Sequence, residues 1–315
     1  MELPRHIRDL YRHWHKHVGD QNVAINDLTP SAMPVIQAIC NFACERIEIW
    51  KRKTGGSLPP FTDDPILLKY RFCNVFREFD EQTIAIHTML NPVRDDFALW
   101  LLNMFYCRMV ARPETIEVVG LLSFDPIQNR IIYDRLIASP RPRYGTPYVF
   151  PVSTIMRSAT PNRERFICEY LPSIMKSTAK EIETWESMSV VDGVKRILPL
   201  FGFNLEFLWT EVLIDVAYQF QDRVNLFDRF PVGPGSMPTM RMVDATSDPV
   251  DLAVRLSSIP FDSGITINGA TLRLSAENWE GISCEFRKYT KLKNGTGRKR
   301  IYREIKNGIE MIPFL

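Results

Sequence analysis

The stretch that decides the fold reads ILPLFGFNLEFLWTEVLIDV and covers residues 197–216. Two apolar segments flank a short turn that holds one glycine, Gly202, and Asn204 is placed to cap the second segment as a helix. That second helix is expected to cover residues 204–220, where few positions are charged. Backbone amides at such a helix start can hold a phosphate. The stretch therefore predicts a helical hairpin, and both a plain hairpin and an anion-binding one fit the pattern.

Helical spacing dominates the rest of the chain. Residues 31–53 repeat apolar side chains at helical intervals, with Ser31 as a candidate cap and Gly55 and Gly56 as the stop. A second helix is expected from Thr62 or Asp63 to about residue 90. Further helices are expected at 4–17, 95–111, 114–122, 161–188, 190–198, 249–259 and 275–290. There is no βαβ alternation and no internal repeat, so the prediction is a mainly α fold.

We expect one helical domain over residues 1–315. Residues 124–160 are rich in Pro and Tyr and are expected to form an irregular insertion, while residues 287–306 form a basic C-terminal segment. The formal net charge is only +2, but basic residues concentrate in 4–17 and 288–306. Local basic patches suit a polyanion surface, although a solvated chain end explains them equally well.

Several classes of protein are disfavoured. The six cysteines form no CxxC pair and no signal peptide is visible, which indicates reduced thiols in a cytoplasm. No apolar run reaches the roughly 18 residues that a membrane span needs. Four of the five histidines crowd into residues 6–17 without partners at zinc-ligand spacing, so no metal site is expected. No GxxxxGK[ST] motif occurs, which disfavours a P-loop kinase.

The stretch YRFCNVFREFDE at residues 70–81 mixes aromatic and charged side chains. Read as a helix, it puts Phe72, Phe76 and Phe79 on one stripe. The opposite face then carries two arginines, an amide and three carboxylates, from Arg71, Asn74, Arg77, Glu78, Asp80 and Glu81. Arginine suits bidentate phosphate contacts and nearby carboxylates can act as bases. A surface helix with i,i+4 ion pairs gives the same pattern, and both interpretations stay open.

Two later segments carry further candidates. VGPGS at residues 232–236 offers backbone amides at Gly233, Gly235 and Ser236, which can form either an anion-holding turn or an ordinary one. SCEFRKYTKLKNGTGRKR at residues 283–300 interleaves aromatic and basic side chains before a glycine-rich loop. This pattern is typical of nucleic-acid backbone contacts, although basic residues also favour a helix C-terminus on dipole grounds alone.

Taken in order, the segments 59–80, 232–236 and 283–300 resemble the thymine-hypermodification proteins of bacteriophages. This group was first described as α-glutamyl/putrescinyl-thymine pyrophosphorylases and includes amino acid:DNA transferases and the helical domain of 5-hydroxymethyluracil DNA kinases. The resemblance covers residues 31–90 and 198–303. It implies an all-helical, DNA-glycosylase-like fold, and the hairpin at 197–216 resembles a helix–hairpin–helix element with Phe203 in place of the second glycine. Departures follow two motifs, where EQTIAI and MPTM stand in place of basic residues.

The resemblance implies a DNA base hypermodification enzyme. It would transfer an amino acid or a polyamine onto a phosphorylated or pyrophosphorylated 5-hydroxymethyluracil in double-stranded DNA, release phosphate or pyrophosphate, and need no cofactor. The modified base would leave the stack to be reached. One alternative is a DNA glycosylase with Asp222 or Asp228 as its catalytic aspartate. Another is a non-catalytic, DNA-binding helical subunit of a 5-hydroxymethyluracil DNA kinase. A phage-encoded protein of this group would work in the cytoplasm of the infected host cell.

The same resemblance suggests roles for the candidate residues. Arg71, Arg77 and Lys288 would bind the leaving phosphate, and Asn74 would read a base edge or orient an arginine. Asp80 or Glu78 would be the base, and Glu285 would hold the amine. The expected DNA contacts come from Gly202, Asn204, Gly233, Gly235, Ser236, Tyr289, Lys291, Arg298, Lys299 and Arg300. The central expectation is that the guanidinium and carboxylate groups of residues 70–81 meet the Glu285–Lys288 pair in a common pocket wide enough for an extruded pyrimidine.

Overall fold

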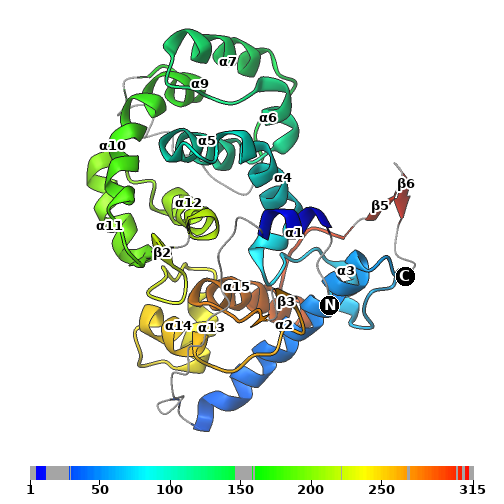
Figure 1. The fold of residues 1–315 in the computed structure, drawn as a ribbon. Coiled ribbons are helices and arrows are strands. Elements are labelled where there is room, and N and C mark those ends of the chain that lie inside the picture. The colour runs from blue at the N-terminus through cyan, green and yellow to red at the C-terminus, as the bar shows by residue number, and fades with distance from the viewer. Residues whose placement is uncertain are drawn as a thin grey trace. The chain divides into compact units, whose positions relative to one another are not determined.

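The computed structural model describes residues 5–11, 28, 30–145, 158, 160–220, 222–267, 270–302, 304–306 and 309–311 (Figure 1). Helices dominate, and the only sheets among these residues are three two-stranded ones. The prediction of a mainly α fold is therefore confirmed. The chain divides into two compact units. Unit 1 comprises Met1–Arg8, His17–Asp80 and Phe227–Leu315, and unit 2 comprises Asp9–Lys16 and Glu81–Leu226. The expectation of a single domain stays a prediction.

Unit 1 is built on two long helices, α2 (Met33–Thr54) and α15 (Ala276–Lys293), which pack against each other. Two shorter helices, α13 (Met237–Val243) and α14 (Pro249–Ser257), pack on α15, and so does the short helix α3 (Pro65–Lys69). Its minor elements are η1 (Pro30–Ala32), η2 (Arg77–Phe79), β3 (Thr266–Ile267), β4 (Ala270–Thr271), β5 (Glu304–Lys306) and β6 (Ile309–Met311). Helix α1 (Arg5–Tyr11) belongs to unit 1 up to Arg8 and to unit 2 from Asp9 on.

Unit 2 surrounds the apolar helix α5 (Phe97–Val110), which packs on α10 (Leu171–Glu183) and on α12 (Glu206–Gln219) (Figure 1). Asp96 caps α5 by accepting the Leu99 backbone N–H at 3.0 Å. Its other elements are α4 (Glu81–Leu90), η3 (Asn91–Val93), α6 (Pro113–Val119), α7 (Pro126–Ala138), α9 (Arg163–Arg165), the π-helical turn η4 (Phe166–Tyr170), β1 (Met188–Ser189), α11 (Val190–Phe201) and β2 (Val224–Asn225).

The hairpin expected at residues 197–216 is present as α11, a turn and α12. Gly202 ends α11 in the left-handed conformation with φ of 78°, which favours glycine. Asn204 does not cap α12, because the helix begins at Glu206 and its N-cap residue, Leu205, forms no side-chain cap bond. The prediction of an Asn204 cap is therefore wrong. The likeness to a DNA-glycosylase fold and to a helix–hairpin–helix stays a prediction.

The expected helix over residues 70–81 is wrong. Helix α3 ends at Lys69, and Tyr70 and Arg71 are extended and pair with the C-terminal segment. Only the 3-10 turn η2 and the start of α4 are helical between residues 70 and 81. The spacing of its aromatic residues suits a helix, but backbone pairing with the distant residues Arg300 and Ile301 overrides that local preference. The three phenylalanines are nevertheless all buried.

Three smaller expectations also change. The cap of α3 is Asp64, whose carboxylate accepts two backbone N–H groups, and not Thr62 or Asp63. Ser31 lies in the 3-10 turn before α2 and does not cap it. The segment 124–160 contains the regular helix α7 over its first half, and residues 146–157 lie outside the described residues. No helix in the described part of the chain is long and apolar enough to span a membrane.

Candidate functional site

The centre of the candidate site is the carboxylate of Glu285, on the buried face of α15. Its Oε1 accepts a hydrogen bond from the Lys288 ammonium at 2.6 Å, and its Oε2 accepts one from the Lys299 ammonium at 2.6 Å. The Cys73 backbone N–H donates to Oε2 at 3.2 Å. Glu285 is only 7% exposed, whereas the Lys288 side chain is 46% exposed and that of Lys299 is 13% exposed. One carboxylate thus holds two ammonium groups, of which one reaches solvent.

Local sequence explains how the two lysines converge. A capping box starts α15, with Ser275 and Asn278 bonding each other's backbone N–H groups. Lys288 follows Glu285 by three residues and therefore lies on the same face. After the helix ends, Gly295 adopts φ of 72°, and the Gly295 and Thr296 N–H groups bond to the carbonyls of Leu292 and Lys291. This tight reversal returns the chain so that Lys299 reaches Glu285.

Electrostatics keep the cluster ionised. Burial acts to raise the pKa of Glu285, but Lys299 and Lys288 outweigh burial, and its pKa lies below the usual value. Partial burial acts to lower the pKa of Lys288, and the carboxylate of Glu285 more than compensates, so that pKa lies above its usual range. The Lys299 ammonium also lies over the Phe72 ring, 4.4 Å from its centroid. At neutral pH the site therefore holds a carboxylate between two cations.

Residues 70–80 reach this cluster as a loop. The Arg71 N–H donates to the Arg300 carbonyl at 2.9 Å, and Tyr70 forms a β-bridge with Ile301. The side chains of Asn74 and Asp80 then close the loop on itself. Asn74 Nδ2 donates to the Phe79 carbonyl at 3.0 Å, and Asp80 Oδ1 accepts the Asn74 N–H at 3.3 Å. The first and last motifs therefore meet within unit 1.

Arg46 is a site residue that the sequence analysis missed. It lies on α2, is 7% exposed, and donates from one guanidinium nitrogen to the carbonyls of Phe72 at 3.0 Å and Cys73 at 3.3 Å. Burial lowers its pKa, and the carboxylates of Glu285 and Asp80 act to raise it. Arginine stays charged in such surroundings. A signal for it existed, because Arg46 interrupts the apolar stripe of α2 between Phe42 and Trp50.

Aromatic side chains pack beside the cluster. Phe42 of α2 contacts Phe72, Phe286 and Tyr289, with ring centroids between 5.1 and 5.8 Å apart. The Tyr289 hydroxyl donates to Asp64 Oδ2 at 2.6 Å, the same carboxylate that caps α3. Burial and this carboxylate raise the pKa of Tyr289 to about 12. Tyr289 therefore joins α15 to α3, and a role for it in DNA binding stays a prediction.

The turn at residues 232–236 is occupied by a protein carboxylate. Glu280 Oε1 accepts from the Gly233 N–H at 3.2 Å and from the Ser236 hydroxyl at 2.6 Å. Ser236 is fully buried. A Cβ atom on Gly235 would lie 2.6 Å from the Cys284 sulfur, so glycine is needed for the close approach to α15. The turn therefore holds an anion of the protein itself and packs on α15, and a DNA contact from this turn stays a prediction.

The remaining predicted residues are spread over the surface and both units. Arg71, Lys291, Arg298 and Arg300 are exposed, Arg77 is half-buried in η2, and Glu78 is fully buried. Gly202 and Asn204 are exposed but belong to the hairpin of unit 2. The thiol of Cys73 lies beside the cluster. Desolvation, then Glu285 and Asp80, raise its pKa to about 12, which leaves it protonated and a poor nucleophile.

Unit 2 has its own buried charge cluster. Asp215 of α12 accepts two hydrogen bonds from the Arg108 guanidinium, at 2.7 and 2.6 Å, and lies 3.1 Å from His87 Nε2. All three side chains are at most 1% exposed. The interpretation of His87 as a satisfied core residue is therefore confirmed. No group of three or more His, Cys, Asp or Glu side chains suited to a metal ion occurs in the described parts of the chain.

The geometry defines a class of protein. It is a mainly helical protein in which three cations, Arg46, Lys288 and Lys299, gather around a buried carboxylate, and cations of this kind suit a phosphate-bearing ligand. The family described as the 5-hmdU DNA kinase, helical domain, matches residues 33–299. The chain belongs to this family, and the resemblance to the phage thymine-hypermodification group is confirmed.

One curated relative is a 5-hmdU DNA kinase of Bacillus phage SP10, which is 28% identical to this chain over 168 residues. The match covers 50% of this chain and 26% of the relative, so the matched segment spans about a quarter of that protein. No solved structure matches this chain.

Proposed function

We propose that this protein modifies thymine-derived bases in DNA by transferring an amino acid or a polyamine onto a phosphorylated or pyrophosphorylated 5-hydroxymethyluracil. The observation that carries the proposal is the Glu285 carboxylate with two ammonium groups at 2.6 Å, beside the loop 70–80. A carboxylate that already binds lysine ammonium groups suits the ammonium of an incoming amine. The surrounding cations suit the phosphate that departs.

The proposed reaction is a substitution at the exocyclic carbon of the base. The amine nitrogen forms a bond to that carbon, and the bond from the carbon to the phosphate oxygen breaks. Phosphate or pyrophosphate leaves with the electron pair, and Lys288, Arg77 and Arg71 take up its charge. The proton released by the amine goes to a carboxylate. Asp80 suits this role better than Glu78, because Asp80 is half-buried and Glu78 has no exposed surface.

Two further observations support a DNA substrate. The relative is named for 5-hmdU in DNA, which is the base that the proposed transfer starts from once it is phosphorylated. The exposed cations Lys291, Arg298 and Arg300 follow the site along the C-terminal segment, where they suit the phosphates of a DNA backbone. Double-stranded DNA with a modified thymine is therefore the proposed macromolecular partner.

A second candidate function is a helical subunit that binds DNA for a 5-hydroxymethyluracil DNA kinase without doing chemistry itself. The family match supports this second candidate, because the family is described as the helical domain of such a kinase. This candidate shares the DNA contacts with the transferase. It differs in predicting no change in the nucleosides of the DNA.

A nucleoside mass measurement distinguishes the two. The protein is mixed with DNA that contains phosphorylated 5-hydroxymethyluracil and with a pool of amino acids and polyamines, and the DNA is then digested to nucleosides. Transferase activity predicts a nucleoside that is heavier than 5-hydroxymethyldeoxyuridine by the mass of one amine minus one water. DNA that contains 5-hydroxymethyluracil without the phosphate is the control. DNA binding with unchanged nucleosides would instead support the kinase subunit.

A further inference from the structure

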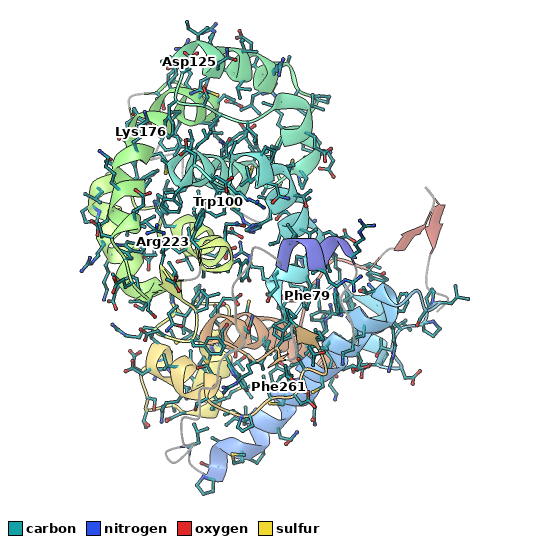
Figure 2. The ribbon with its side chains drawn as sticks, viewed as in Figure 1. Phe79, Trp100, Asp125, Lys176, Arg223 and Phe261 are labelled. Atoms are coloured by element: carbon teal, nitrogen blue, oxygen red, sulfur yellow. The ribbon has the colours of Figure 1, made fainter. Side chains whose placement is uncertain are left out.

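A pocket of about 520 Å³ lies in unit 2, and none of the residues assigned a role above lines it. It is lined by α7, the π-helical turn η4 and the start of α10. The chemically informative lining residues are Phe124, Arg130, Tyr133, Glu169, Ser173 and Lys176. Figure 2 labels Lys176 and Asp125, the N-cap residue of α7, on this part of the unit. A pocket of this volume has room for a ligand of mononucleotide size.

Each aromatic ring in the pocket is faced by a cation. The Lys176 ammonium lies 4.5 Å from the centre of the Phe124 ring. The guanidinium groups of Arg130 and Arg165 lie 5.1 and 5.4 Å from the centre of the Tyr133 ring. Cations stacked on aromatic rings beside a pocket are the combination by which proteins hold unpaired nucleotides.

The charge balance of the pocket favours an anion. Arg165 is paired with Glu169 at 2.9 Å, and Arg130 is paired with Asp134 at 3.4 Å. Both side chains of the second pair are more than half exposed, so this pair is weak and Arg130 can turn to another anion. Lys176 has no carboxylate partner among the described residues. The lining itself therefore carries two cations, Arg130 and Lys176, against one carboxylate, Glu169, and Lys176 is available to a ligand.

The backbone at the pocket is unusual. Residues Phe166–Tyr170 form a π-helical turn, which disturbs the regular helix and places Cys168 and Glu169 in the pocket wall. Turns of this kind are rare in proteins overall, and those that occur are often found at functional sites. Burial raises the pKa of Cys168 to about 12, so its thiol is neutral. The wall therefore adds no further negative charge beyond Glu169.

The sequence around the pocket is basic although the chain as a whole is nearly neutral. The described residues between 130 and 176 contain seven Lys or Arg against three Asp or Glu, an excess of four positive charges, while the full chain has a net charge of +2. Such a local excess attracts the phosphates of a nucleic-acid strand rather than a small neutral ligand.

We propose that this pocket is a second nucleic-acid site, which takes one unpaired nucleotide of a single strand. Its phosphate binds Lys176 and Arg130, and its base lies against the apolar wall formed by Phe124 and Pro172. The site is independent of the transferase proposal, because it lies in unit 2 and uses none of the residues around Glu285.

The test measures binding of a fluorescently labelled oligothymidylate of about 12 nucleotides to the full chain, by anisotropy, at several salt concentrations. Lys176→Gln is expected to weaken binding and to lower the slope of log affinity against log salt by about 0.7, the value for one phosphate contact on a single strand. Ser173→Asp, which adds a carboxylate to the pocket, is expected to weaken binding as well. Lys195→Gln, an exposed lysine on α11 that is paired with Asp192, is the matched control and is expected to bind as the wild type does.

Competition experiments test whether the pocket recognises a nucleotide or only its phosphate group. Thymidine monophosphate is expected to displace the strand from the wild type at lower concentration than inorganic phosphate. Lys176→Gln is expected to weaken the binding of both competitors, because it removes a phosphate contact and leaves the base contact. Thermal unfolding checks that each variant is folded. The proposal is overturned if Lys176→Gln and Ser173→Asp both bind like the wild type, or if Lys195→Gln loses as much affinity as Lys176→Gln. Equal competition by phosphate and by the nucleotide would overturn the base contact.

Discussion

Two of the buried carboxylates, Asp215 in unit 2 and Glu285 in unit 1, are held in different ways. Asp215 is held by a single guanidinium fork, by His87, and by surroundings that leave all three side chains at most 1% exposed. Glu285 is held by two separate ammonium groups, one of which is 46% exposed. An arginine fork fixes geometry, whereas flexible lysines can exchange partners. The first arrangement stabilises a fold, and the second suits a site where ligands come and go.

The largest expected loss of stability follows from a substitution in the buried cluster of unit 2, which consists of Asp215, Arg108 and His87. Asp215→Ala leaves Arg108 buried without its counter-charge, and breaking a buried pair in this way costs about 3–5 kcal/mol of unfolding free energy. Urea unfolding measures the loss. Glu117→Ala, an exposed carboxylate on α6, is the control and is expected to change stability by no more than about 0.5 kcal/mol. A loss below about 1 kcal/mol for Asp215→Ala would remove the contrast between the clusters.

The next effect tests how tightly the helix that carries Glu285 is packed. Gly235→Ala places a Cβ atom 2.6 Å from the sulfur of Cys284, the neighbour of Glu285, and is expected to destabilise the protein by about 1–3 kcal/mol. Adding Cys284→Ala removes the sulfur, and the remaining contact to the Cys284 Cβ is 3.6 Å, so the double variant should regain most of the loss. Without such recovery in thermal unfolding, the close approach of turn and helix is not the cause.

The Glu285 cluster should respond to pH in a defined direction. Because the folded pKa of Glu285 lies below its usual 4.5, its ion pairs contribute stability that is complete above that value and is lost as pH falls through the folded pKa. Glu285→Gln is expected to cost about 1–2 kcal/mol at pH 7, less than Asp215→Ala. The difference in unfolding free energy between wild type and Glu285→Gln should shrink below pH 4.5. A constant difference from pH 7 to pH 3 would contradict the ion pairs.

The smallest effect separates the two lysines. Lys288→Gln should change stability by no more than about 1 kcal/mol, because nearly half of its side chain (46%) is exposed to solvent. Lys299→Gln should cost more, since its ammonium is 13% exposed and also packs on Phe72. Unfolding curves at pH 7 compare the two variants directly. If Lys288 proved the more important for stability, it would be a structural residue and not the exchangeable one.

The same two regions show what the sequence can and cannot predict. Apolar periodicity places α2, α5, α12 and α15 close to their observed bounds, because helical spacing is a local property. Helical spacing predicts a helix over residues 70–81, where the structure has a loop. The loop depends on the pairing of Tyr70 with Ile301, which is more than 200 residues away in the sequence. The pairing of Arg108 with Asp215 cannot be predicted from local sequence either, because the two residues are far apart along the chain.

Within the site, the type of a residue indicated that it belongs to the site, but its position in the sequence did not indicate which residues it contacts. The charged residues of the first and last motifs were found, and the structure joins those motifs through Cys73 and Glu285. Lys299 contacts Glu285, a partner that its sequence position does not indicate, and its expected DNA contact stays a prediction. Arg46 was overlooked because a single charge within an apolar stripe carries little weight without its partners. Its interaction with the loop 70–80 depends on tertiary packing that no local pattern contains.

The most direct test of the account compares Glu285→Gln with Glu117→Gln in amine transfer. Both proteins are incubated with DNA that contains phosphorylated 5-hydroxymethyluracil and with the amine pool, and the digested nucleosides are weighed by mass spectrometry. The account predicts the amine-bearing nucleoside with Glu117→Gln and its loss with a folded Glu285→Gln. Equal amounts of that nucleoside from both variants would contradict the role of Glu285.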